Sequence, residues 1–139
     1  MILRFRLPLC EKSKAQPQVR RDKARFYQYA WFYNFKFAIA RHIPADTDLL
    51  VTAASLGTKK EKLSFTNCLS DVMGQTITTG RWAVDFRPSV ADCSLQMADY
   101  CAWAIQRKWE RNDTRSYDMI KDRITYEYDL WRRGAVHHY

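Results

Sequence analysis

Three polar residues at helical spacing carry the strongest chemical signal in this sequence. Asp92, Gln96 and Asp99 occupy positions i, i+4 and i+7, so in a helix their side chains share one face. The two carboxylates are then about 10 Å apart along the helix axis. Oxygen ligands hold hard divalent cations at about 2–2.6 Å, so the two acids cannot bind one cation together. Each is expected to bind part of a site that other elements complete.

Each of these acids also has a structural interpretation. Asp92 stands three residues before Leu95, the first predicted core leucine, which is typical of a helix N-cap. Asp99 lies inside the helix, where aspartate has poor propensity and no capping role, and solvent exposure or a salt bridge is its structural alternative. Asp85 lies on a predicted strand, but nothing in its spacing distinguishes it from a solvent-facing residue.

The elements that position these residues follow from hydrophobic periodicity. Alternating or continuous apolar runs predict strands at residues 2–7, 48–54 and 81–87. Apolar residues at steps of three and four predict helices at residues 23–43, 59–74, 92–111 and 115–132, with Gly134 as the final helix stop. The polar stretch at 11–22 predicts a loop. The order βαβαβαα favours an α/β layered domain with crossover helices.

Two of the predicted helices have distinctive apolar patterns. The helix at residues 23–43 is apolar nearly all round, which predicts burial on two sides, with a partner or self-association surface as the alternative. The helix at residues 92–111 has one predicted core stripe, separate from the face that carries Asp92 and Asp99. That stripe consists of Leu95, Ala98, Ala102, Ile105 and Trp109.

The excess positive charge lies near the start of the chain. Residues 1–41 contain ten Lys and Arg against two acids, whereas basic and acidic residues balance in 42–139. This distribution favours a phosphate-binding arm, with a solvated linker as the alternative. The candidate nucleic-acid contacts are Arg20, Arg21 and Arg25, together with Lys59 and Lys60 in the first turn of a predicted helix, where simple solvation is the alternative.

Length and composition limit the class of protein. The chain has 139 residues, which predicts a single domain over 1–139, with a strand and basic linker in 1–22 and an α/β core in 23–139. No apolar run approaches the roughly 18 residues of a membrane span, and no signal-peptide pattern is present. The four cysteines and three histidines lack zinc-ligand spacing. We therefore expect a cytoplasmic protein without a membrane partner.

One segment resembles a known family. The run from Ser89 to Tyr100, Ser-Val-Ala-Asp-Cys-Ser-Leu-Gln-Met-Ala-Asp-Tyr, resembles the carboxy-terminal part of the bacterial family called domain of unknown function 3800. Its specific part is the Leu-Gln-x-Ala-Asp core that ends at Asp99. The Tyr-Gln-Tyr-Ala run at residues 27–30 and the strand at 48–54 are also similar, so the resemblance extends from Lys23 onward.

The resemblance implies a truncated RNase H-like fold and metal-dependent phosphodiester chemistry on nucleic acid. It implies Mg²⁺ or Mn²⁺ as cofactor, with Asp99 and Asp92 as metal-binding and catalytic acids and Gln96 as an orienting group beside them. Full-length members open with a strand that ends in an Asp-Glu-Ser-Gly-like motif, and this motif is absent here. The first catalytic strand is therefore in doubt, and a separate amino-terminal half or a second copy of the chain would have to supply it.

Two other functions remain open at this point. The chain could be a basic nucleic-acid- or protein-binding module without chemistry, whose affinity would depend steeply on salt. It could also be a decayed fragment that associates with itself through its aromatic helix.

Overall fold

The computed structural model describes residues 5–10, 12–55, 57–78 and 80–129. Within these residues the chain is a mixed helix and strand protein, and none of its helices is long and apolar enough to cross a membrane. Its main elements are β1 (Phe5–Leu9), α1 (Pro17–Arg21), α2 (Lys23–Tyr33), β2 (Leu49–Ala54), α3 (Lys59–Thr76), β3 (Trp82–Arg87), α4 (Cys93–Arg111), α5 (Arg115–Asp118) and β4 (Ile124–Asp129). Short helical turns complete the order: η1 (Lys12–Lys14), η2 (Asn34–Ile39), η3 (Ala40–His42), η4 (Ser89–Ala91) and η5 (Lys121–Arg123).

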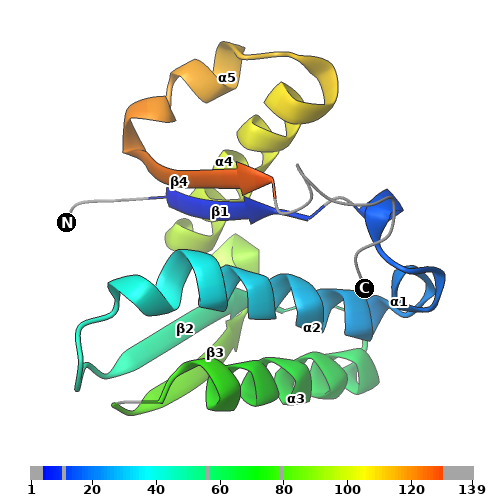
Figure 1. Ribbon diagram of the computed structural model, residues 1–139, viewed down its shortest axis with the longest axis vertical. Helices are drawn as coiled ribbons and strands as arrows, with labels where there is room; N and C mark the ends of the chain where they lie inside the picture. The colour runs from blue at the N-terminus through cyan, green and yellow to red at the C-terminus, as the bar shows by residue number, and fades with distance from the viewer. Residues whose placement is uncertain (1–4, 11, 56, 79, 130–139) are drawn as a thin grey trace.

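The described strands form two separate parallel pairs. Strand β2 pairs with β3, with Val51 opposite Val84, and α3 makes the crossover between them. Strand β1 pairs with β4, although more than one hundred residues separate them in the chain. Figure 1 shows the two pairs on either side of α2 and η2. The expected mixture of helices and parallel strands is thus present. The described strands, however, form two separate pairs and not one larger sheet.

The larger core lies between the β2–β3 pair and the helices α2, η2 and α3. The fully buried side chains at its centre include Phe35 from η2 and Leu69 and Met73 from α3. Val51 and Ala53 alternate with more exposed residues along β2 and reach the same core, as the period of two in a strand requires. The predicted long aromatic helix therefore forms, but as α2 followed by a π-helical segment and a 3₁₀ turn.

A second, smaller core joins α4 to the β1–β4 pair. It contains Cys101, Ala104, Ile105 and Ile120, and Leu9 of β1 packs against it. Charged groups reinforce it, because Glu127 of β4 lies against the last turns of α4. The two cores are connected where β1 packs against η2.

The predicted helix over residues 115–132 is wrong. Of the described part of this range, which ends at Asp129, Arg115–Asp118 is α-helical, and after a 3₁₀ turn the chain becomes strand β4 at Ile124. Ile124 and Tyr128, four residues apart, fit both a helical and a strand period. The β-branched and aromatic composition of this segment suits a strand, and pairing with β1 decides the outcome. Gly134, the expected stop, lies outside the described residues.

The predicted core stripe of α4 is only partly correct. Leu95 and Ile105 are buried, but Ala98, Ala102 and Trp109 are exposed. Cys101 and Ala104 take their places in the core. The helix has apolar residues on more than one side, so its sequence did not determine which side would meet β1 and β4.

Two predictions near the amino terminus also change. Strand β1 covers Phe5–Leu9 and so continues through Pro8, while residues 2–4 of the predicted strand lie outside the described residues. The expected loop at 11–22 contains the short helix α1, which begins at Pro17. Proline is favoured at the first helical position because its missing N–H has no helical partner there.

Candidate carboxylate site

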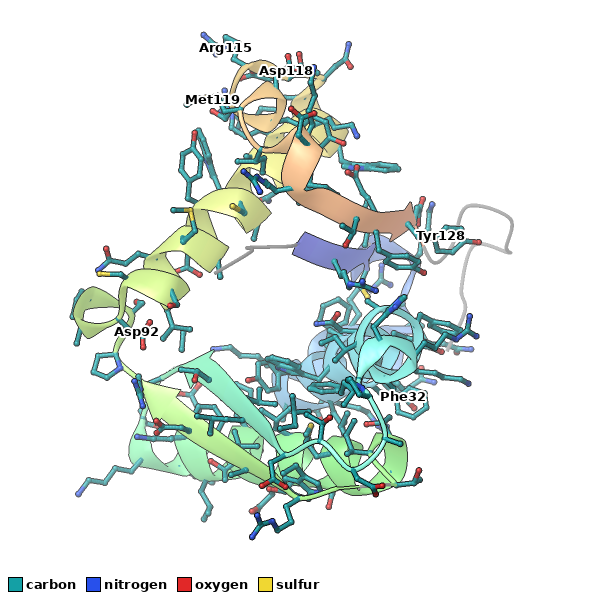
Figure 2. All side chains as sticks on the ribbon, turned by 90° about the vertical axis from the view of Figure 1, so that its left-hand side faces the viewer. Phe32, Asp92, Arg115, Asp118, Met119 and Tyr128 are labelled. Atoms are coloured by element: carbon teal, nitrogen blue, oxygen red, sulfur yellow. The ribbon has the colours of Figure 1, made fainter. Side chains whose placement is uncertain are left out.

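The junction between β3 and α4 brings polar side chains together. Strand β3 ends at Arg87, Pro88 prevents its continuation, and the η4 turn redirects the chain into α4 after Asp92. Figure 2 shows Asp92 at this junction, beside the end of the β2–β3 pair. The carboxyl ends of parallel strands are the usual position of ligand sites in α/β sheets.

Two carboxylates at this junction share one guanidinium group. Arg87 Nε lies 2.6 Å from Asp85 Oδ2, and Arg87 Nη1 lies 3.3 Å from Asp92 Oδ2. Asp85 and Arg87 point to the same side of β3 because they are two residues apart. We call Asp85, Arg87 and Asp92 the carboxylate cluster. It combines acids from a strand and a helix N-terminus around one positive charge.

Asp92 is the N-cap of α4, as its structural interpretation predicted. Its Oδ1 atom accepts hydrogen bonds from the backbone N–H groups of Ser94, at 2.9 Å, and Leu95, at 3.1 Å. The bond from Leu95 is the largest influence that lowers the pKa of Asp92, and the bonds from Ser94 and Arg87 also lower it. Asp92 is therefore held as a carboxylate, with one oxygen bound to the helix and the other turned toward Arg87.

Gln96 holds the turn that carries Asp92. Its Nε2 atom donates to the backbone carbonyls of Ser89, at 3.1 Å, and Val90, at 3.2 Å. These bonds fasten η4 to the first turns of α4. The interpretation of Gln96 as an orienting group is thus compatible with its position, although within the described residues its amide contacts backbone rather than Asp92.

Asp99 lies further along α4 and is exposed. It follows Asp92 by seven residues, which corresponds to about 10 Å along the helix. Within the described ranges its carboxylate has no hydrogen-bond or ion-pair partner. The structure therefore places Asp99 on the same helix as the carboxylate cluster but does not join it to the cluster.

The basic candidates gather at one end of the helix pair. Lys59 and Lys60 are exposed in the first turn of α3, and Arg21 and Arg25 are exposed near the start of α2. An ion pair of 3.6 Å between Lys23 and Glu61 joins these two helix starts. Arg20, by contrast, turns back on the linker and donates to the carbonyl of Ser13 at 3.2 Å.

The described residues do not form a complete metal site. Across the described ranges, no three His, Cys, Asp or Glu side chains lie close enough to hold one metal ion. The carboxylate cluster offers two acids, and one Asp92 oxygen is already bound to the helix backbone. Carboxylates suit Mg²⁺ and Mn²⁺, but these residues alone do not meet the ligand number of such ions.

Comparison with protein-family models, with curated proteins and with solved structures found no match for this chain.

Sequence reasoning missed the role of Arg87. The signal was present, because Asp85 and Arg87 are alternate residues of one strand and a strand places alternate residues on one face. What the sequence did not contain was the direction of the η4 turn, which brings Asp92 to the same guanidinium. Asp85 accordingly belongs with Asp92, whereas the spacing alone had linked Asp92 with Asp99.

Proposed function

We propose that this chain is part of an RNase H-like, metal-dependent nuclease that acts on nucleic acid. The observation that supports the proposal is the carboxylate cluster. In it, the carboxylates of Asp85 and Asp92 both contact the Arg87 guanidinium at the carboxyl end of a parallel strand pair. Asp99 stands further along the same helix. In such an enzyme a bound divalent cation would activate water and stabilise the leaving oxygen.

The residues of this chain have separate parts in the proposed site. Asp92 and Asp85 supply the carboxylates, Gln96 fixes the η4 turn, and Arg87 keeps the two acids together when no metal is bound. A guanidinium between two carboxylates offsets the repulsion that they would otherwise have. Asp99 lies about two turns beyond Asp92 on α4 and can approach a substrate from its exposed position.

In the isolated chain, water would complete the coordination of the ion, and a separate amino-terminal half or a second copy of the chain would supply further ligands. Large apolar side chains are exposed on β2, η4 and α4, and an exposed apolar surface supports a covering partner. They are Leu50 of β2, Val90 of η4 and Met97 of α4, with exposures of 60%, 86% and 46%.

Titration with Mn²⁺ tests the carboxylate cluster directly. We expect the wild-type chain to bind Mn²⁺ and the Asp92→Asn variant to lose that binding, as measured by isothermal calorimetry. Asparagine is also a good N-cap, so this variant keeps the start of α4 while it removes the charge. The Arg87→Gln variant should bind Mn²⁺ more tightly, because it removes the cation that competes for the same oxygens.

The matched control is Asp48→Asn. Asp48 forms an exposed ion pair with Arg81 at 2.7 Å, remote from the α4 N-cap, so its replacement should leave Mn²⁺ binding unchanged. The Asp99→Asn variant then separates the role of Asp99 from that of Asp92 in assays of nucleic-acid cleavage. Absence of Mn²⁺ binding in both the wild type and Arg87→Gln would refute the proposed metal site.

A basic nucleic-acid-binding module without chemistry is the second candidate. The joined starts of α2 and α3, with exposed Arg21, Arg25, Lys59 and Lys60, support it. Helix N-termini add positive potential at this end. This candidate predicts nucleic-acid binding that falls steeply with salt and is unchanged in Asp92→Asn and Asp99→Asn.

A further inference from the structure

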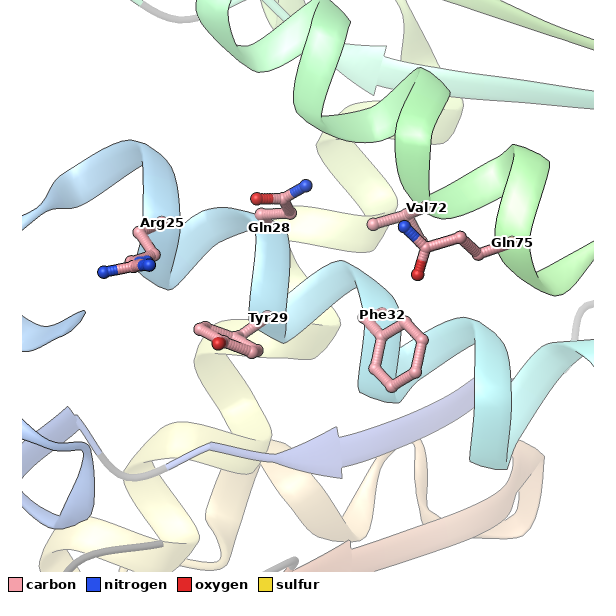
Figure 3. Close-up of a pocket in the computed structure, with 6 residues that line it drawn as sticks. All are labelled: Arg25, Gln28, Tyr29, Phe32, Val72 and Gln75. Atoms are coloured by element: carbon pink, nitrogen blue, oxygen red, sulfur yellow. The ribbon is translucent and has the colours of Figure 1, made fainter. Parts of the chain in front are cut away.

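A pocket of about 280 Å³ opens between α2 and α3. Figure 3 shows its lining, with four side chains from α2 and two from α3. The α2 residues are spaced i, i+3, i+4 and i+7, so they form one face of that helix. The lining residues are Arg25, Gln28, Tyr29, Phe32, Val72 and Gln75.

Three of the polar side chains in this pocket have no partner among the described residues. Within the part of the chain that the structure describes, neither the Arg25 guanidinium nor the amides of Gln28 and Gln75 form hydrogen bonds or ion pairs. The backbone N–H of Arg25 donates to the Asp22 carboxylate at 3.0 Å, so only the main chain of Arg25 is engaged at the start of α2 within the described residues. One cation and two amides, each able to donate and the amides able to accept, thus surround one space.

The pocket also has an apolar and aromatic surface. Val72 is almost fully buried and forms part of the larger core, and Phe32 packs against that core. Phe32 and Tyr29 present rings to the same pocket. Aromatic side chains on a positively charged surface are the usual platform for unpaired bases.

The charge around the pocket favours an anionic ligand. Helices α1, α2 and η2 contain no acidic residue, and the acids nearest the lining along the chain are the N-cap Asp22 and Asp71 of α3. Arg25 lies at one end of the lining, and at the other end the Lys36 ammonium lies 5.4 Å from the centre of the Phe32 ring. The two ends are about 10 Å apart along α2, which leaves room for a base between two positively charged groups.

We propose that this pocket binds one nucleotide unit of a single-stranded nucleic acid. The base lies against Tyr29 and Phe32, the amides of Gln28 and Gln75 bond to its edge, and Arg25 binds a neighbouring phosphate. Only an unpaired base presents both its face and its edge to such a pocket. For the class of its ligand the inference rests on the proposed function, but the pocket is separate from the carboxylate cluster.

The test is fluorescence anisotropy with a short labelled single-stranded oligonucleotide, measured in EDTA so that metal binding plays no part. Arg25→Gln and Gln75→Ala change exposed side chains, so the fold should persist, which circular dichroism checks. Each should weaken binding about tenfold, as the loss of a charged or buried hydrogen bond does. Arg25→Gln should also reduce the slope of log affinity against log salt concentration by about 1, because it removes one phosphate contact.

Arg41→Gln is the matched control, since it removes the same charge from an exposed residue beyond the pocket, near Phe37. It should leave the affinity within the experimental error. If Arg41→Gln lost as much affinity for the oligonucleotide as the pocket variants, or if neither pocket variant lost affinity, the pocket would not be the binding site.

Two further measurements test the ligand. A duplex of the same sequence should bind more weakly, and equal binding would overturn the single-strand assignment. A free mononucleotide that displaced the oligonucleotide with equal affinity would also overturn it. Asp92→Asn should keep oligonucleotide binding while it loses Mn²⁺ binding, so failure of the pocket and failure of the metal site give different results.

Discussion

Replacing Phe35 with alanine is expected to remove about 3–5 kcal/mol from the free energy of unfolding, the usual cost of deleting a buried phenylalanine. Phe35 is 1% exposed at the centre of the larger core. Its ring stacks on Trp31 at 5.7 Å. Because small domains are stable by only about 5–15 kcal/mol, this variant should lose a large part of its stability in urea denaturation.

The position of Phe35 offers a control on the same segment. Phe37, two residues further along η2, is only half-buried, and Lys36 and Arg41 lie over its ring. Its replacement with alanine should cost much less than the Phe35 change. If Phe35→Ala does not fold, Phe35→Leu, which retains most of the volume, should still report a loss of about 1 kcal/mol. Equal effects at residues 35 and 37 would contradict the described core.

Replacing Glu127 with glutamine is expected to destabilise the chain by about 1.5–3 kcal/mol, the usual contribution of hydrogen bonds to a charged group, since the network is partly buried. Glu127 Oε1 accepts from Lys108 Nζ at 2.7 Å and from the indole N–H of Trp109. Its other oxygen accepts from the Tyr117 hydroxyl at 2.8 Å. A glutamine amide replaces one acceptor with a donor, and Lys108 loses its counter-charge.

The Glu127 network also predicts a pH dependence. Burial by itself would raise the pKa of Glu127, but the bonds from Lys108, Trp109 and Tyr117 outweigh it and hold the pKa below its ordinary value of 4.5. The unfolded chain therefore binds this proton at higher pH than the folded chain does. The stabilisation is present above about pH 4.5 and is lost as the pH falls, so the difference between wild type and Glu127→Gln should shrink on acidification.

Glu110 provides the matched control for Glu127. It lies on the exposed surface of α4, and among the described residues its carboxylate accepts from the amide of Gln106, at 2.9 Å. Glu110→Gln should change the urea midpoint little at any pH, as exposed polar substitutions do. A pH-independent difference for Glu127→Gln would show that the network does not depend on the ionised carboxylate.

Local signals in the sequence predicted most elements correctly. Thr58 and Glu61 form the capping box that begins α3, and Asp92 caps α4. These bonds join residues two or three positions apart, so the sequence near each helix end contains all the partners. The β2–α3–β3 crossover could be predicted for the same reason, because its parts follow one another directly in the chain.

The errors arose where distant residues decide the structure. Ile124–Asp129 becomes a strand because β1, near the other end of the chain, supplies its backbone partners. The side of α4 that is buried depends on contact with Ile120 and Leu9, so Cys101 and Ala104 are buried in place of Ala98 and Ala102. Neither result can be read from the periodicity of one segment.

The candidate sites divide in the same way. The sequence determined which residues could do chemistry, namely Asp92, Gln96 and Asp99 on one helix, and it determined that the positive charge lies in residues 1–41. Only the tertiary structure paired Asp92 with Asp85 across Arg87, and only the packing of α2 on α3 made a pocket beside Arg25. Side-chain type is a local property, whereas a site requires groups from separate elements to meet, and the packing of those elements decides which groups do.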